Sequence, residues 1–318
     1  NVSDEAQDGR FSIRIKGKDI EIRTSILPGN FAESVVLRLL DPETIKVPLE
    51  SLGMSEKLLT RILKEIAKPN GMLLTTGPTG SGKTTTLYAF LRRVNAPETK
   101  IITIEDPIEY HLGGIVQTQV DKKNYTFALG LRSALRQDPD IIMVGEIRDK
   151  EVAETAIHAA LTGHLVFSTL HTNNAAGSFP RLIDLDVNFK VLSSAVNVAM
   201  AQRLVRKLCV VCKKKRAATK EEFDLIKKTT AGITDRTLLP KETGVVYEPV
   251  GCPECHGLGF KGRIGTFEAI FMDEEIEKVL QSGNPSEREV AKAAKAQGIP
   301  TMQEDGVLKV LQGVTALE

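Results

Sequence analysis

One glycine-rich segment, Gly77-Pro-Thr-Gly-Ser-Gly-Lys-Thr84, constrains the fold of this chain more than any other feature. An apolar run over residues 72–76 precedes the segment, and residues 85–91 continue it as a helix-like run. A strand, a glycine-rich loop and a helix in this order form a P-loop, whose backbone N–H groups surround phosphate oxygens. The sequence therefore predicts an α/β core that binds a nucleotide.

Nine consecutive residues are expected to hold the nucleotide: Gly77, Pro78, Thr79, Gly80, Ser81, Gly82, Lys83, Thr84 and Thr85. In such a loop Lys83 reaches the β- and γ-phosphates, and the Thr84 hydroxyl binds Mg²⁺. The alternative is a glycine-rich turn between core elements, but a plain turn gives no reason for the Lys-Thr pair. ATP and Mg²⁺ are therefore the expected ligands.

The size and charge of the chain limit its class. A length of 318 residues is long for one domain, and a net charge of +1 gives no general attraction to nucleic acid or membranes. No uncharged apolar run approaches the ~20 residues that span a bilayer. The first residues resemble no signal peptide, and Asn1 is not an initiator methionine. We expect a cytoplasmic chain that is part of a longer protein.

The pattern of apolar residues changes near residue 68. Residues 10–25 alternate as a β-hairpin, and residues 55–67 have the spacing of an amphipathic helix, so 1–68 is predicted to be a small α+β domain. Beyond it strands and helices alternate, which predicts a parallel sheet with its ligand site at the carboxyl ends of the strands. The predicted strands are 71–76, 101–105, 141–145 and 164–170, and the predicted helices are 84–95, 126–137, 150–162 and 190–208.

The predicted core covers 69–205, a cysteine-bearing module covers 206–262, and a helical region covers 263–318.

Two core strands end in acidic residues. Glu105, followed by Asp106 and Glu109, ends one, and Glu146 follows the other. ATP hydrolysis needs one acid near the metal and one that orients the attacking water. We assign water activation to Glu105 and the hold on Mg²⁺ and its water shell to Glu146, with the reverse assignment as the alternative. Asp106 and Glu109 fit ordinary loop carboxylates equally well.

A histidine follows the last predicted core strand. His171 and Thr172 lie at its carboxyl end, where they could sense the γ-phosphate and couple hydrolysis to motion. The alternative for a single histidine at a strand end is a structural, hydrogen-bonded role.

The four cysteines form two CxxC pairs, Cys209 with Cys212 and Cys252 with Cys255. Four thiolates with this spacing can converge on Zn²⁺ in a closed, structural site. Disulfides or a redox-active pair are the alternatives, and a reducing compartment disfavours both. Basic residues flank the first pair, but no aromatic residues are interleaved for base stacking, so no direct nucleic-acid binding is expected.

Four segments, in this order, resemble the signatures of the secretion ATPases of type II secretion and type IV pilus assembly, the GspE- and PilB-like proteins. They are GPTGSGKTTTLY (77–88), TIEDPIEY (103–110), LRQDPDIIMVGEIRD (135–149) and LTGHLVFSTLHTN (161–173). The resemblance covers nearly the whole chain. It implies a PAS-like domain, here partial, over 1–68 and a RecA-like core over 69–205.

The resemblance also implies a homo-hexamer that is cytoplasmic and peripheral to the inner membrane. ATP would lie between subunits, and an inner-membrane platform protein would transmit hydrolysis to the assembly of pilins or pseudopilins. Four arginines, Arg10, Arg23, Arg132 and Arg136, match family arginines that reach ATP across a domain or subunit boundary. The alternation alone would place Arg10 and Arg23 on a solvated strand face.

The tetracysteine module of this chain resembles those of the GspE- and PilB-like assembly motors. The PilT-like retraction motors have no such module, so the resemblance favours assembly. Two competing functions stay open at this point. One is a nucleic-acid translocase on the same RecA-like core, and the other is a nucleotide-gated scaffold that does not turn ATP over.

Overall fold

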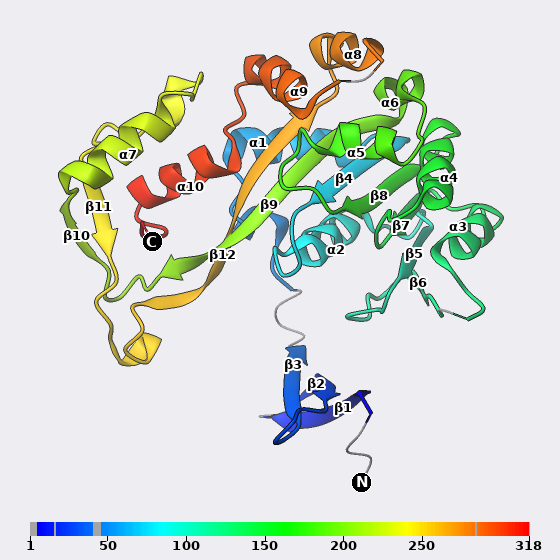
Figure 1. Ribbon diagram of the computed structural model, residues 1–318, viewed down its shortest axis with the longest axis horizontal. Helices are drawn as coiled ribbons and strands as arrows, with labels where there is room; N and C mark the ends of the chain where they lie inside the picture. The colour runs from blue at the N-terminus through cyan, green and yellow to red at the C-terminus, as the bar shows by residue number, and fades with distance from the viewer. Residues whose placement is uncertain (1–4, 16, 41–45, 122, 284, 318) are drawn as a thin grey trace.

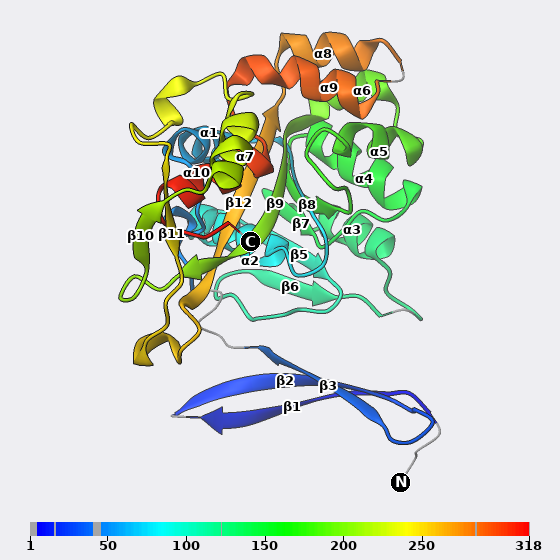
Figure 2. The same ribbon diagram turned by 60° about the vertical axis from the view of Figure 1, so that its left-hand side comes forward.

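The computed structural model describes residues 5–15, 17–40, 46–121, 123–283 and 285–317. Its main body is a seven-stranded sheet with the order β12-β9-β4-β8-β7-β5-β6, with helices on both faces (Figures 1 and 2). The strands are β4 (Gly71–Thr76), β5 (Ile101–Glu105), β6 (Val116–Gln119), β7 (Ile141–Val144), β8 (Leu165–Leu170), β9 (Val196–Leu208) and β12 (Phe260–Phe271).

Six of these strands run parallel, and β12 pairs antiparallel with β9 at one edge. Every residue of β4, β7 and β8 is buried, because helices cover both faces of the sheet. This explains why the sequence of these strands is almost continuously apolar. The predicted α/β fold with a parallel sheet is confirmed.

Helices pack on both faces of the sheet. On the first face are α1 (Glu56–Ile66) and α2 (Lys83–Val94), and on the second α3 (Phe127–Leu135), α4 (Lys150–Leu161), α5 (Ser178–Asp184) and α6 (Phe189–Ala195). Side-chain caps fix several starts: Ser55, Thr126 and Asp149 each accept a backbone N–H of the first turn. These signals are local, which is why the predicted helix ranges lie close to the observed ones.

The predicted helix over 190–208 is wrong in its larger part. Helix α6 ends at Ala195, and residues 196–208 form strand β9 between β4 and β12. Residues 198–201 are fully buried between two neighbouring strands. A short apolar run buried on both faces has no polar alternation, so periodicity alone cannot separate a strand from a helix.

The N-terminal part is a separate three-stranded antiparallel sheet of β1 (Gln7–Ile15), β2 (Lys18–Leu27) and β3 (Ser34–Leu40). The predicted hairpin is present. Figure 2 shows this sheet lying apart from the main one, on the side of β6. Arg23 bridges the two bodies, since its Nη2 donates to the carbonyl of Ile108 at 2.9 Å. Helix α1, just before the predicted boundary near residue 68, packs into the same apolar cluster as β4 and α2.

The cysteine-bearing part lies at the end of a long two-stranded arm made by β9 and β12, beyond the main sheet (Figure 1). A small antiparallel pair, β10 (Lys214–Ala217) and β11 (Val245–Glu248), and helix α7 (Lys220–Thr230) complete it. Residues 263–271, predicted to begin a helical region, belong to β12. The helices that follow are α8 (Glu274–Gln281), α9 (Glu287–Ala294) and α10 (Met302–Leu311).

In the part of the chain that the structure describes, none of the helices has both the length and the apolar character needed to cross a bilayer.

Candidate functional site

The glycine-rich loop joins the end of β4 at Thr76 to the start of α2 at Lys83. Three of its glycines have positive φ: Gly77 at 144°, Gly80 at 80° and Gly82 at 91°. Side chains are disfavoured there by backbone sterics, and a Cβ on Gly77 would lie 2.6 Å from the carbonyl oxygen of Gln202. The glycines therefore allow the backbone to curl tightly against its neighbour.

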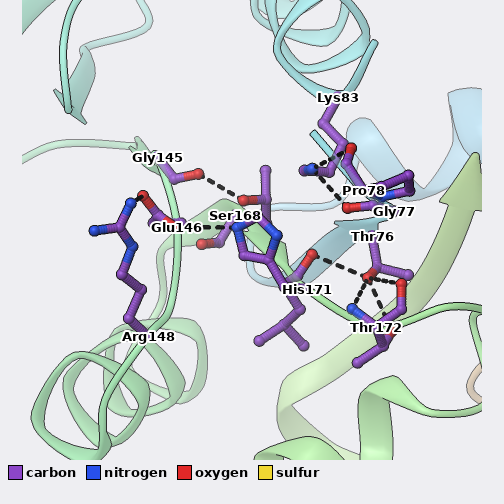
Figure 3. Close-up of polar contacts among 12 residues, drawn as sticks. Thr76, Gly77, Pro78, Lys83, Gly145, Glu146, Arg148, Ser168, His171 and Thr172 are labelled. Atoms are coloured by element: carbon purple, nitrogen blue, oxygen red, sulfur yellow. Dashed lines mark hydrogen bonds and ion pairs between the residues drawn. The ribbon is translucent and has the colours of Figure 1, made fainter. Parts of the chain in front are cut away.

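The Lys83 side chain folds back over this loop. Its Nζ donates to the carbonyl oxygens of Gly77 at 2.7 Å and of Pro78 at 3.1 Å (Figure 3). Burial lowers the pKa of Lys83, and the nearby Glu146 carboxylate opposes that shift. Because Lys83 opens α2, Thr84 and Thr85 lie in the first turn of the helix, beside the positive end of its dipole. The ammonium group is thus held at the loop by these carbonyls, and the negative charge of Glu146 stabilises it.

Glu146 forms a polar cluster after the end of β7. Its side chain is 12% exposed, and its Oε2 lies 3.1 Å from Nε2 of His171, which follows β8. Its Oε1 makes an ion pair with Arg148, and this hydrogen bond raises the pKa of Arg148 (Figure 3). The structure therefore brings Lys83, Glu146 and His171 to the carboxyl edge of the sheet.

A threonine pair connects this edge to the start of the loop. The Thr172 backbone N–H donates to Oγ1 of Thr76 at 2.7 Å, and Thr76 Oγ1 donates to the Leu170 carbonyl at 2.9 Å. The last residue of β4 is therefore fixed to the segment that carries His171. A movement of either segment alone would break these hydrogen bonds.

Glu105 lies at the end of β5 in a different environment. Its side chain is 3% exposed, and its carboxylate accepts hydrogen bonds from the Tyr88 hydroxyl, the Thr103 hydroxyl and Nε2 of Gln117. Burial and then the charge of Glu105 raise the pKa of Tyr88, which keeps this phenol protonated as a donor. These donors come from α2, β5 and β6, and none belongs to loop residues 77–82, all of which are described. The assignment of water activation to Glu105 stays a prediction.

The four predicted arginines also have partners outside the loop. The pairs are Arg10 with Glu21, Arg23 with the Ile108 carbonyl, Arg132 with Glu151, and Arg136 with the Ser133 hydroxyl. Within this one chain, these partners all lie outside residues 77–85. Their role in completing a site across a boundary stays a prediction.

The four cysteines converge at the end of the β9–β12 arm. All four thiols are free, and their sulfur atoms lie within 4.8 Å of one another. Three Sγ–Sγ distances are 3.8, 3.7 and 3.7 Å. Four sulfurs at about 2.3 Å from a tetrahedral Zn²⁺ lie roughly 3.8 Å apart, so the observed spacing fits this ion.

The pKa of one of these thiols, that of Cys255, is lowered. Burial raises the pKa of Cys255, but the backbone N–H groups of Cys252 and Gly259 donate to its sulfur and lower the value to about 6. Metal ligation requires thiolates, so this polarisation favours the ligand form at neutral pH. The donor set and its spacing are suited to a structural ion.

Sequence reasoning missed two residues that contact the site. Tyr88 was hidden in the apolar face of α2, although its hydroxyl bonds Glu105. Gln202 was placed in a helix, although it lies on β9 and donates to the Ser81 carbonyl of the loop. Gln202 directly follows the apolar residues 198–201, and this position was the available signal for the second, since a buried amide needs a partner.

Comparison with known proteins adds an independent finding. A family model described as "Type II/IV secretion system protein" matches residues 5–318. The Type II secretion system protein E of Pseudomonas aeruginosa is 48% identical over 98% of this chain and 60% of its own length. The Type II secretion system ATPase E of Vibrio cholerae is 44% identical over the same shares. The chain thus spans about 60% of the length of these relatives.

Solved structures show the same fold. The pilus retraction motor PilT with bound ADP is 27% identical, with a TM-score of 0.60 over 95% of this chain and 77% of that one. The ATPase DotB of Legionella pneumophila has a TM-score of 0.67 at 24% identity, over 99% of this chain and 76% of that one.

Proposed function

The chain belongs to the type II/IV secretion system protein family, and from this premise we propose that it is the ATP-hydrolysing part of a motor for type II secretion or type IV pilus assembly. The observation that carries the proposal is the glycine-rich loop with Lys83 beside Glu146 and His171 at one edge of a parallel sheet. The ADP in the PilT structure supports a nucleotide as ligand, since that motor has the same fold at 27% identity.

In the proposed reaction the loop N–H groups hold the phosphates, and Lys83 exchanges its carbonyl partners for phosphate oxygens. Thr84 and Glu146 are the residues that would hold Mg²⁺, and this ion would neutralise part of the phosphate charge. The contacts of the Glu146 carboxylate with His171 and Arg148 would orient it for this role. His171 would respond to the γ-phosphate through this shared carboxylate.

Glu105 is proposed to orient the attacking water. Its carboxylate accepts three hydrogen bonds, from Tyr88, Thr103 and Gln117, which would hold it in one orientation toward that water. Arg10, Arg23, Arg132 and Arg136 are proposed to complete the site from another domain or subunit, where closure would stabilise the charge on the transferred phosphoryl group.

The larger assembly is part of the same proposal. We infer a homo-hexamer that works at the cytoplasmic side of an inner-membrane platform protein, because the curated relatives are components of secretion systems. The cysteine cluster, with spacing that suits Zn²⁺, would tie the two ends of the β9–β12 arm together as a structural site. The cysteine cluster supports assembly rather than retraction, because it resembles the tetracysteine modules of the assembly motors.

The test is an ATPase assay of matched carboxylate-to-amide variants. Glu146→Gln and Glu105→Gln should each lose about 100-fold or more in turnover, as expected for groups that act on the transition state. Glu275→Gln is the control, because this exposed glutamate on α8 pairs only locally with Lys278. Lys83→Ala should lose nucleotide binding as well.

The same assay separates the competing functions. ATP binding by the wild type without turnover above background, and so no further loss in Glu146→Gln or Glu105→Gln, would overturn the motor and favour a scaffold that binds ATP without hydrolysis. Strong stimulation of the wild-type rate by DNA or RNA would favour a nucleic-acid translocase.

A further inference from the structure

Strand β9 carries a glutamine against the glycine-rich loop. The pairing of β9 with β4 ends at Ala201 opposite Thr76, and Gln202 is the next residue, at the point where β4 gives way to the loop. On its other side Gln202 pairs with Phe267 of β12. The side chain of Gln202 is 1% exposed, so it is enclosed between the loop and the sheet.

The contact between Gln202 and the loop involves both its backbone and its side chain. Nε2 of Gln202 donates to the Ser81 carbonyl at 2.7 Å. A Cβ on Gly77 would lie 2.6 Å from the Gln202 carbonyl oxygen, and one on Gly82 would lie 3.0 Å from Nε2 of Gln202. Gly77 is therefore required by the backbone of β9 as well as by its own φ, while Gly82 packs closely against the Gln202 side chain.

This hydrogen bond fixes the orientation of a peptide plane. In a trans peptide the C=O and N–H groups point in opposite directions, so the Ser81 carbonyl held toward β9 turns the Gly82 N–H away from β9. A phosphate-binding loop needs its N–H groups turned inward and its carbonyls outward, since an inward carbonyl would repel the anion. Gln202 supplies the buried donor that an outward carbonyl requires.

We propose that Gln202 is a positioning residue of the nucleotide loop, holding the Ser81–Gly82 peptide in the orientation that binds phosphate. The inference rests on the proposed nucleotide function and adds to it a residue from outside the four sequence signatures. Gln202 does not touch the nucleotide in this role; it acts through Ser81.

Two unpaired atoms support a specific role over simple space filling. Oε1 of Gln202 and Oγ of Ser81 are buried with no hydrogen-bond partner among the residues that the structure describes. A buried unpaired polar atom costs free energy, and a methionine or leucine would fill the same space without that cost. The hydrogen bond from Nε2 to the Ser81 carbonyl is therefore the favourable polar contact of this side chain.

The experiment compares two amide side chains of one strand. Gln202→Met removes the donor and keeps the volume. Asn197→Leu is the control, because Asn197 lies at the other end of β9 and its side-chain amide donates to the carbonyl of Asn70 at 3.2 Å, in a more exposed hydrogen bond away from the loop. Binding of a fluorescent ADP analogue with Mg²⁺ is titrated for each variant, and its melting temperature is recorded without nucleotide.

We expect Gln202→Met to bind the analogue about tenfold more weakly, the effect of losing one buried hydrogen bond. Asn197→Leu should stay within about twofold of the wild type, whatever its melting temperature. In steady-state assays the Gln202 variant should show a raised KM with a smaller change in kcat. A role confined to stability would lower the melting temperature in both variants and leave the dissociation constants alone.

A folded Gln202→Met variant with wild-type affinity would overturn the inference and leave the proposed function intact. If this variant fails to fold, Gln202→Leu replaces it, since leucine also lacks a donor; wild-type affinity there overturns the inference equally. Failure of the wild type to bind the analogue would overturn both the inference and the proposed function.

Discussion

The Tyr88–Glu105 hydrogen bond offers a sharp quantitative test of the core beneath the site. Tyr88 is 0% exposed and lies on α2, and Glu105 is 3% exposed at the end of β5. The substitution Tyr88→Phe keeps the ring in place and removes only the hydroxyl that donates to the carboxylate. It leaves a buried charge with two of its three donors, Thr103 and Gln117.

The expected cost follows from the charge of the acceptor. A hydrogen bond to a charged group contributes about 1.5–3 kcal/mol, against roughly 0.5–1.5 kcal/mol for a neutral pair. Tyr125→Phe provides the neutral comparison, because the Tyr125 hydroxyl donates to the Thr118 hydroxyl at 3.2 Å. Tyr88→Phe should therefore lower the free energy of unfolding by about 2 kcal/mol, and Tyr125→Phe by about 1 kcal/mol or less.

Urea denaturation followed by circular dichroism measures both values. A double-mutant cycle isolates the pair, because Tyr88→Phe should cost clearly less in a Glu105→Gln background, where the acceptor is a neutral amide. An interaction free energy of about 1 kcal/mol between the two sites is expected. Equal losses for Tyr88→Phe and Tyr125→Phe, together with strict additivity with Glu105→Gln, would refute the view that Tyr88 stabilises an ionised Glu105.

Three further predictions concern other parts of the molecule. Burial lowers the pKa of Lys83 and phosphate favours its ammonium form, so ADP affinity should be full at neutral pH and fall as the pH rises through that lowered pKa. Lys83→Arg should bind without this alkaline loss between about pH 7 and about pH 10, and parallel declines would contradict the reasoning. Chelation of bound metal, or Cys255→Ser, should increase amide hydrogen exchange in residues 206–262 while the main sheet stays protected; unchanged exchange would argue against a structural ion. Arg23→Ala removes the hydrogen bond to Ile108 and should raise exchange in residues 106–111. A melting curve identical to the wild type, with identical exchange there, would show that this bridge contributes nothing.

The amino-acid sequence by itself determined the local structure around the nucleotide loop. The order of apolar run, glycines and helix start located β4 and α2, and the apolar spacing placed helices over 126–137 and 150–162, close to α3 and α4. The CxxC spacing identified four cysteines that converge in space. These features depend on interactions within a few residues, so a pattern of neighbouring residues is sufficient to reveal them.

Only the tertiary structure decided which distant groups meet. Glu105 and Glu146 are equivalent in the sequence, as acids after apolar strands, yet Glu105 is buried under Tyr88 while Glu146 lies within electrostatic reach of Lys83. The strand β9 was mistaken for a helix, and with it the contact of Gln202 with the loop was missed. The physical reason is common to these cases. Strand order and register are set by burial between non-neighbouring segments, which leaves no periodic signal in a segment covered on both faces.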